Sequence, residues 1–204
     1  MTDSLSGHEL RKAEKRETII AGAIKAFEQE GYERASMDLV AEFAGASKRT
    51  VYNHFDSKKE LLWAVVAQLM AGQQEVRQIT YSEVESLESQ LVRFVDAQMY
   101  FVTDPKRLSI VRLLTTIFLQ NEELRQEASQ GEKCEPDPLI EWLRAAHKDK
   151  RLKVEDPELM AKIFRGMIEG TINFPALYSP LQTADELKPT RDEIVALFLS
   201  RYRF

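Results

Sequence analysis

The chain has little of what several protein classes need, and these shortages narrow what it can be. A single cysteine among 204 residues leaves no partner for a disulfide within the chain, which fits a reducing cytoplasm. The longest uninterrupted apolar run, Leu61–Ala67, is far shorter than the roughly 20 residues of a membrane-spanning helix. The N-terminus lacks the apolar core of a secretory signal. We therefore expect a soluble, cytoplasmic protein that does not bind a membrane.

Signatures of catalysis and metal binding are also missing. His8, His54 and His147 lie far apart, and none has another His or Cys at the spacing of metal ligands. Cys134 stands among acidic residues, which disfavour a thiolate and indicate an inert thiol. No P-loop, G-x-S-x-G, H-E-x-x-H or dinucleotide-binding fingerprint occurs. We therefore expect no metal, no cofactor and no enzymatic activity, although catalytic residues can also converge from distant positions.

Helix-breaking residues are scarce. All seven prolines lie at Pro105 or later, and only eight glycines are spread over the chain, while Ala, Leu, Glu, Lys, Gln and Arg are common. No segment alternates apolar and polar residues convincingly, as a half-buried strand would. The sequence predicts an all-α fold.

Four helices are predicted in succession at the N-terminus. The first covers residues 9–30, carries one apolar face and stops at Gly31. A short second helix follows Ser36, whose hydroxyl can accept from the free backbone N–H groups of the first turn. Gly45 ends this second helix.

The third and fourth helices complete a recognisable pattern. Ser47 can cap a third helix over residues 48–54, and Ser57 with Glu60 forms an S-x-x-E capping box for the fourth. Two short helices joined by a three-residue turn that contains glycine are the pattern of a helix-turn-helix, and the first and fourth helices would supply the floor of its core.

Basic residues gather in two places although the chain as a whole is acidic. The formal net charge is -5, and residues 1–60 hold ten basic and eleven acidic residues. Yet residues 11–16 carry a local charge of +3, and the basic and acidic residues of 48–59 give another +3. Phosphate contacts act within about one Debye length (~8 Å), so two basic patches on an acidic body can bind DNA.

The third helix carries the side chains best suited to reading DNA. Since Val51 and Phe55 face the core, four polar side chains project near its N-terminal end: Lys48, Arg49, Thr50 and Asn53. Arg or Lys can donate to guanine O6 and N7 in a major groove, and the methyl of Thr can touch thymine. Three flanking side chains can donate to phosphates: Tyr52, His54 and Lys58. Ser47, which caps this helix, belongs to the same predicted DNA-binding set.

The stretch Ser36–Leu62, SMDLVAEFAGASKRTVYNHFDSKKELL, resembles the signature of the TetR family of transcriptional regulators, and the resemblance is specific over about residues 15–65. The shared features are Ser36, the Ala44–Gly45 turn, Ser47, Tyr52, Phe55 and the Ser57–Lys58 start of the fourth helix. The resemblance implies a homodimer that binds a palindromic operator on double-stranded DNA, most simply a repressor released by a small-molecule effector. It also implies roles for individual residues: backbone contacts for Ser36, Tyr52, His54 and Lys58, and base reading by Lys48, Arg49 and Thr50.

The expected domains are a DNA-binding helix-turn-helix domain, residues 1–60, and an effector-binding and dimerisation domain, residues 61–204. The fourth helix would join them and link the effector site to the DNA-reading helices. Further helices are predicted over 86–102, after Pro105, around Trp142, from Asp156–Pro157 to about 177 and from a capping box at Thr190 and Glu193 to about 202, with a polar loop at 130–138.

The resemblance implies an effector pocket in the second domain, and the large aromatic residues there lead us to expect a lipophilic, aromatic-tolerant effector. The residues expected near the pocket are Phe94, Phe101, Phe118, Trp142, Asn173 and Phe174. Each aromatic residue alone is more often plain core than ligand wall, and the alternative for Asn173 is a hydrogen bond to neighbouring backbone. The last two helices are apolar over more than one stripe, which indicates either burial against a second copy or two deeply buried core helices. For a dimer, Gly166 and Gly170 would allow close approach, and the expected contact residues are Phe164, Ile168, Ile194 and Phe198.

Two other functions stay open on the sequence alone. The N-terminal helices could be structural parts of an all-helical enzyme or small-molecule carrier. The basic helix could instead dock an acidic protein partner, although that use needs neither the glycine turn nor the flanking caps. An activator of the same fold cannot be separated from a repressor.

Overall fold

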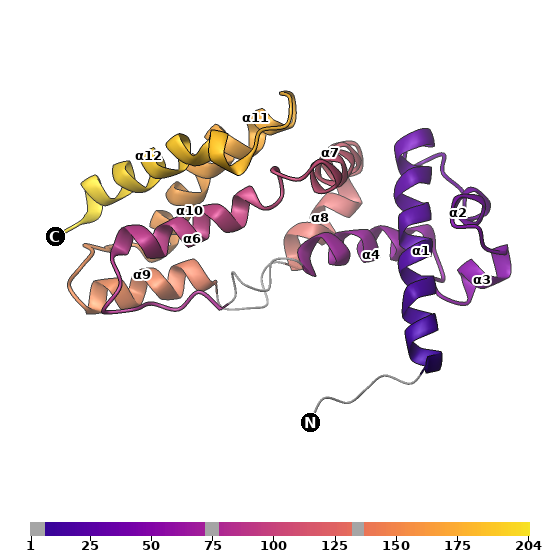
Figure 1. The fold of residues 1–204 in the computed structure, drawn as a ribbon, viewed down its shortest axis with the longest axis horizontal. Helices are drawn as coiled ribbons and strands as arrows, with labels where there is room; N and C mark the ends of the chain where they lie inside the picture. The colour runs from indigo at the N-terminus through magenta and orange to yellow at the C-terminus, as the bar shows by residue number, and fades with distance from the viewer. Residues whose placement is uncertain (1–6, 72–77, 132–136) are drawn as a thin grey trace. The chain divides into compact units, whose positions relative to one another are not determined.

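The computed structural model describes residues 7–71, 78–131 and 137–204, whose regular elements are helices (Figure 1). The one β-type pairing among these described residues is an isolated bridge between Leu152 and Arg203. The predicted all-α fold is confirmed.

Two compact units make up the chain. Unit 1 comprises Met1–Met70 and Leu113–Gln120, and unit 2 comprises Ala71–Arg112 and Asn121–Phe204. The fourth helix, α4 (Lys58–Ala71), is grouped with the N-terminal helices. The boundary predicted between the DNA-binding and effector-binding domains follows Glu60, inside the first turn of α4, whereas the compact units place nearly all of α4 in unit 1.

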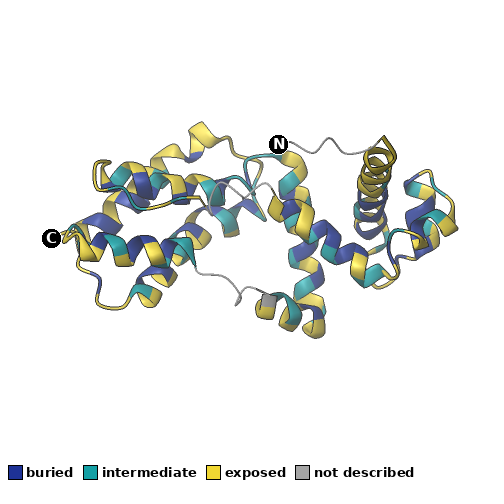
Figure 2. Ribbon diagram, turned by 90° about the horizontal axis from the view of Figure 1, so that it is seen from below, coloured by how far each residue is buried: buried dark blue, intermediate teal, exposed yellow. Residues whose placement is uncertain are grey.

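Unit 1 is built around α1 (Gly7–Glu30), against which α2 (Met37–Phe43) packs. The buried residues of α1 begin only at its thirteenth residue and recur at helical spacing: Ile19, Ile20, Gly22, Ala23, Ala26 and Phe27. In Figure 2 the end of α1 nearest the N-terminus is accordingly yellow. Gly31 follows the helix with φ of 76°, so the predicted glycine stop is confirmed.

Serine caps start α2 and α3 (Lys48–Tyr52) as predicted. The Ser36 hydroxyl accepts from the backbone N–H of Leu39 at 3.2 Å, and the Ser47 hydroxyl accepts from that of Thr50 at 3.1 Å. Each bond satisfies one of the N–H groups that a first helical turn leaves free.

The capping box predicted for α4 forms with one difference. The Ser57 hydroxyl accepts from the Glu60 N–H at 3.1 Å, as expected. The Glu60 carboxylate, however, accepts from the N–H of Asp56 at 2.6 Å, one residue before the cap. The start of α4 is therefore held by a carboxylate that reaches back to the preceding turn.

A close crossing joins α1 to the end of α2. A Cβ atom built on Gly22 would lie 2.8 Å from the Ala44 backbone nitrogen, 2.9 Å from the Ala44 Cβ and 3.0 Å from the Val40 carbonyl oxygen. The absence of a side chain at Gly22 therefore sets how closely the helix-turn-helix lies on its supporting helix.

Unit 2 packs its helices around one core. Its elements are α6 (Leu87–Met99), the first part of α7 (Pro105–Gln120), α8 (Glu122–Gly131), α9 (Pro138–Lys148), α10 (Pro157–Ile168), the π-helical turn η2 (Glu169–Asn173), α11 (Phe174–Ala176) and α12 (Ala184–Tyr202). α12 packs against α6, and α10 packs against α9 and α12. The largest side chains of this core are Trp142, Phe164 and Phe198.

The predicted start of the terminal helix at Thr190 is wrong. α12 begins at Ala184, where the Thr183 hydroxyl accepts from the Glu186 N–H at 3.3 Å and the Glu186 carboxylate accepts from the Thr183 N–H at 2.8 Å. This capping box stands before Pro189, which lies inside α12, so the proline does not mark the helix boundary. The predicted end near Tyr202 is confirmed.

The helix predicted from Asp156–Pro157 to about residue 177 starts as expected, because Asp156 accepts from the Leu159 N–H at 2.9 Å. Its second half differs, since η2 widens the turn before α11 continues. In the polar segment 130–138, α8 extends to Gly131, and Cys134 with its neighbours 132–136 lies outside the described residues.

Candidate nucleic-acid interface

The frame of the site is α2, a short turn and α3. Gly45 in the turn has φ of 53°, a left-handed conformation that side chains disfavour. Val51 and Phe55 are 0% and 1% exposed, so they anchor α3 and the residues after it in the unit 1 core. With that side of α3 fixed, its remaining side chains turn towards the surface.

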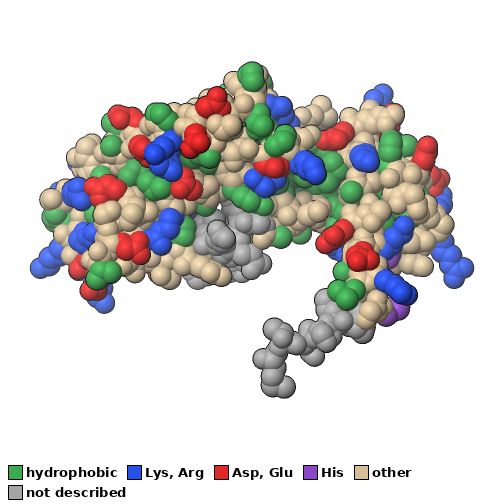
Figure 3. Space-filling view, in the orientation of Figure 1, with side chains coloured by type: hydrophobic (Ala, Val, Ile, Leu, Met, Phe, Trp, Pro, Cys, Tyr) green, Lys and Arg blue, Asp and Glu red, His purple; other side chains and the backbone are tan. Residues whose placement is uncertain are grey.

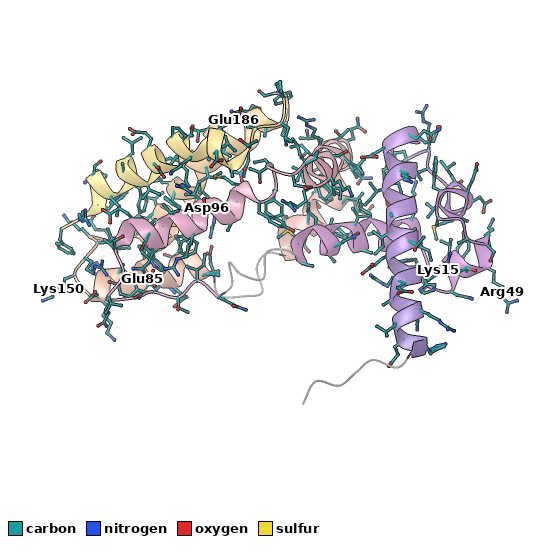
Figure 4. All side chains as sticks on the ribbon, viewed as in Figure 1. Lys15, Arg49, Glu85, Asp96, Lys150 and Glu186 are labelled. Atoms are coloured by element: carbon teal, nitrogen blue, oxygen red, sulfur yellow. The ribbon has the colours of Figure 1, made fainter. Side chains whose placement is uncertain are left out.

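Lys48 and Arg49, the first residues of α3, are both exposed but differ in their surroundings. Lys48 forms an ion pair with Asp38 of α2 at 2.8 Å. A hydrogen bond and the charge of Asp38 raise the pKa of Lys48, whose ammonium stays charged. The guanidinium of Arg49 forms no ion pair or hydrogen bond with the described residues, and Figure 4 shows this side chain projecting away from α1. Arg49 is the cation of α3 that is free to reach a base edge.

The other residues predicted at the reading end are held or exposed in different ways. The Thr50 and Ser47 hydroxyls lie 2.8 Å apart, so Thr50 takes part in the N-terminal cap and is half-buried. Asn53 is exposed and forms the C-cap of α3. Tyr52 is 43% exposed, which leaves its phenol accessible to a phosphate.

His54 lies half-buried beside basic residues of α1. Burial, followed by the charges of Lys12, Arg16 and Lys15, lowers the pKa of His54 from its ordinary value of 6.5. The imidazole is therefore predominantly neutral at pH 7 in the free protein. An approaching phosphate would offset these positive charges and favour the protonated form.

Lys58 was expected to contact phosphate, but its ammonium donates to the backbone carbonyls of Tyr32 and Glu33, the second at 2.8 Å. It also lies over the Tyr32 ring at 4.6 Å from the centroid. Lys58 therefore ties the start of α4 to the turn after α1, and its contact with DNA stays a prediction. The Ser36 hydroxyl keeps a proton to donate, because as a cap it acts only as an acceptor.

The basic residues of α1 were recognised in the sequence, but their neighbours were not. Lys15 donates to the Gly45 carbonyl at 3.4 Å, and the Arg16 guanidinium lies 4.9 Å from the centroid of the Phe55 ring. Lys, Arg and His side chains gather around the N-terminal half of α1 (Figure 3). The two basic segments predicted from the sequence therefore meet at the turn before α3.

Neither of the two cavities in unit 2 described below is lined by more than one of the six residues expected near an effector. Phe94 and Trp142 are buried in the unit 2 core with ring centroids 6.1 Å apart, and the Trp142 N–H donates to Gln90 at 3.0 Å. Phe101 packs half-buried against the same core. Phe118 belongs instead to unit 1, where it stacks on Trp63 at 6.0 Å.

Asn173 and Phe174 also lie apart from a pocket. The Asn173 amide nitrogen donates to Glu169 at 2.9 Å, while its amide oxygen is buried with no hydrogen-bond partner among the described residues. Phe174 is 58% exposed and packs edge-on against Tyr178. Among the described cavities, one of about 50 Å³ includes Phe94, and a surface groove of about 600 Å³ between α6 and α12 includes none of the six.

The residues expected at a dimer interface need correcting. Phe164, Ile168, Ile194 and Phe198 are 0–3% exposed in the core of unit 2, so they have no surface to offer a second chain. These four residues instead fit the other explanation of the apolar sequence, in which the last two helices are buried in the core of their own domain. The exposed apolar residues of α10 are Leu159 and Ile163, and the helical spacing continues through the exposed Gly166 and Gly170.

Residues 7–71, 78–131 and 137–204 contain neither a cluster of metal ligands nor a membrane-spanning helix. No three or more His, Cys, Asp and Glu side chains of these residues are arranged to hold a metal ion. None of the helices described has both the length and the apolar character needed to cross a bilayer.

Two family models match the chain. Residues 19–65 match the model described as bacterial regulatory proteins, tetR family. Residues 89–204 match the model described as the C-terminal domain of an AefR-like transcriptional repressor. The first match covers the frame of α2, the turn and α3, and the second covers most of unit 2.

Individual proteins are also similar to this chain. A TetR family transcriptional regulator from Pseudomonas syringae pv. tomato str. DC3000 is 30% identical, with a TM-score of 0.77 over 93% of this chain and 97% of that one. The HTH-type transcriptional regulator SrpR of Pseudomonas putida is 26% identical over 94% of this chain and 88% of its own. The HTH-type transcriptional activator FasR of Mycolicibacterium smegmatis is 31% identical over 53% of this chain, a match that spans only 57% of FasR.

Proposed function

We propose that this chain, which belongs to the TetR family of bacterial regulatory proteins, is a repressor that binds a palindromic operator as a homodimer and leaves it when a small molecule binds unit 2. As a family member it is a DNA-binding transcriptional regulator and not an enzyme. The observation that carries the proposal is the capped helix-turn-helix, which leaves Arg49 exposed and unpaired among the described residues.

The chemistry of α3 supports sequence reading by Arg49 and positioning by its neighbours. A guanidinium can donate two hydrogen bonds to guanine O6 and N7, which distinguishes that base from the other three in a major groove. Tyr52 and His54 flank it and suit phosphate contacts, which fix register without reading sequence. Lys48 would have to exchange its Asp38 partner for DNA.

The direction of regulation is proposed from unit 2. The model that matches residues 89–204 describes the C-terminal domain of a repressor. FasR is an activator, but only 57% of its length matches this chain. We give more weight to the first match, since it covers most of the unit that would receive the signal.

A homodimer is supported by the exposed face of α10. Leu159 is 51% and Ile163 39% exposed, and they are followed at helical spacing by Gly166 and Gly170, where a Cβ atom would meet no atom within 4 Å. Apolar and small residues along one exposed helix face suit close packing against the same face of a second copy. Two copies would present two α3 helices to successive major grooves, about 34 Å apart or a multiple of that.

A small cavity in unit 2 supports a lipophilic effector. The cavity of about 50 Å³ has mainly apolar walls, including Phe94, Leu139 and Ile168. Ligand pockets in proteins measure roughly 300–1,000 Å³, so a ligand would have to displace the surrounding helices. Binding that requires such a displacement favours one conformation over another, which is the basis of allosteric release.

Selection of bound duplexes from random DNA, with and without a panel of lipophilic compounds, tests the proposal. We expect an inverted repeat to be enriched and at least one compound to abolish that enrichment. Enrichment of an asymmetric site would contradict the dimer, and enrichment that no lipophilic compound alters would count against the proposed effector class.

Transcription in vitro from a promoter that carries the selected site tests the direction of regulation. The proposal predicts less transcript when the protein is added and recovery when the active compound is present. More transcript on addition of the protein would identify an activator.

A further inference from the structure

The N-terminal half of α1 extends beyond the core that it supports. Every residue from Gly7 to Thr18 is exposed except the half-buried Lys15, and the first buried residue of the helix is Ile19. The family match for the DNA-binding part also begins at residue 19. Three helical turns therefore precede both the packed core and the part of the chain that the family model describes, and burial in that core does not explain their composition.

Basic residues of this segment continue the buried stripe of α1. Residues seven apart lie two turns apart on the same side of a helix. Lys12, Lys15 and Arg16 stand seven residues before Ile19, Gly22 and Ala23, all three of which are buried. The side of α1 that faces its neighbours thus changes from apolar to basic where the core ends.

Acidic residues of the same segment lie on other sides of the helix. Glu14 stands seven residues before the exposed Ala21, and Glu17 seven before the half-buried Ile24. The separation of charge across α1 gives the basic side a local field that the net charge of the whole chain conceals.

The basic side of α1 converges on the DNA-reading frame. Lys15 reaches the carbonyl of Gly45 in the turn before α3, and Arg16 lies over the ring of Phe55 after α3. Lys12, Lys15 and Arg16 all act on His54 and lower its pKa, in addition to the larger effect of burial. In Figure 4 Lys15 lies on the side of α1 that faces α3. A polyanion in contact with α3 would therefore come within reach of these cations.

We propose that Lys12, Lys15 and Arg16, the α1 basic patch, form a second contact with the DNA backbone beyond the contacts of α2 and α3. Phosphate is the partner that suits this patch, because its cations are held by a rigid helix next to the turn that leads into α3. The inference rests on the proposed contact of α3 with DNA.

Matched lysine substitutions on α1 test this inference. Lys12→Gln and Lys25→Gln remove the same charge from exposed positions of one helix, but Lys25 lies outside the buried stripe. The affinity of each full-length variant is measured against salt concentration with a random-sequence DNA duplex. For Lys12→Gln we expect roughly 5- to 10-fold weaker binding near 0.1 M salt and a log–log salt slope reduced by about 0.9. Lys25→Gln should match the wild type.

A double variant and a chemical footprint strengthen the test. Lys12→Gln/Lys15→Gln should reduce the salt slope by about 1.8, since two phosphate contacts are removed. Ethylation interference should show phosphates whose modification weakens the wild type but not the double variant. The melting temperature of each variant is compared with that of the wild type to confirm that the fold is intact.

Two results would overturn the inference. In the first, Lys12→Gln keeps the affinity and salt slope of the wild type. In the second, Lys12→Gln and Lys25→Gln lose affinity equally, which would mean that only the total charge of the helix matters. Arg49→Ala separates this failure from a failure of the proposed function. If Lys12→Gln binds DNA normally and Arg49→Ala loses its sequence preference, only the proposed role of the α1 basic patch is refuted. If Lys12→Gln binds more weakly and Arg49→Ala keeps its sequence preference, the role of α3 is refuted and that of the patch is supported.

Discussion

At the scale of single residues, cations that look equivalent in the sequence differ in what they are free to do. Lys48 is paired with Asp38, and the ammonium of Lys58 donates to the carbonyl of Tyr32, whereas Arg49 is unpaired among the described residues. A lysine that must give up a partner in the protein loses part of the free energy that it gains from contact with DNA. Arg49 is therefore expected to contribute more to DNA affinity than either lysine.

His54 should make DNA binding depend on pH. Burial, and then the charges of Lys12, Arg16 and Lys15, hold its pKa below 6.5 in the free protein, and a nearby phosphate would raise that pKa. Between the pKa of His54 in the complex and its lower pKa in the free protein, the complex binds a proton that the free protein lacks. DNA affinity should therefore rise as the pH falls through this range. Fluorescence anisotropy with a labelled duplex, between about pH 5.5 and 8, measures this dependence.

His54→Gln should remove the pH dependence, while His147→Gln on α9 of unit 2 should retain it. Glutamine keeps a donor near phosphate but does not titrate. An unchanged pH profile in the His54→Gln variant would show that another group is responsible.

At the scale of helices, the contact between α1 and α2 depends on Gly22. An added methyl group would lie under 3.0 Å from two atoms of Ala44, and one of these is backbone, so the crossing would have to open. Gly22→Ala should lower the free energy of unfolding by about 1–3 kcal/mol despite the better helix propensity of alanine. Urea unfolding of the full chain measures the change.

The neighbouring Ala21 provides the control, because it is exposed and on the same helix. Ala21→Ser also adds one heavy atom, and surface changes of this kind usually alter stability by no more than about 0.5 kcal/mol. Equal stability of Gly22→Ala and the wild type would mean that the crossing can widen without cost.

Helix starts were predictable from sequence where only one capping residue stands before the helix. Ser36, Ser47 and Asp156 all accept the backbone bonds expected of them. The start of α12 was misplaced because two capping boxes stand seven residues apart around Pro189, and only the tertiary fold selects the first. The role of Gly22 was missed because a close crossing involves a second helix, which the periodicity of one helix does not reveal.

At the scale of the whole molecule, residue type and periodicity did not separate core from surface in unit 2. Phe164 and Phe198 are apolar and lie on apolar helices, but their rings meet each other at 4.9 Å inside the core. Phe174 has the same chemistry and is 58% exposed. Which side of a wide apolar helix meets its own domain depends on the packing of α6, α9 and α12, and this information is spread over the chain.

The oligomeric state should depend on the exposed face of α10. Ile163→Glu places a charge next to Leu159 and Gly166, so the proposed homodimer should dissociate to monomers because a buried charge without a partner is costly. Sedimentation equilibrium measures the mass. Val84→Glu, at a position 95% exposed outside the helices, makes the same kind of change and should leave the dimer intact. A dimeric Ile163→Glu protein would place the interface elsewhere.

Recognition of DNA by α3 is the central claim, and the affinity of Arg49→Ala for the selected operator tests it most directly. At matched salt we predict a loss of about 1–3 kcal/mol for the operator, a smaller loss for an unrelated duplex and an unchanged melting temperature. The difference between the two duplexes separates base reading from general attraction to phosphate. An Arg49→Ala protein that binds the operator as tightly and as selectively as the wild type would contradict the account.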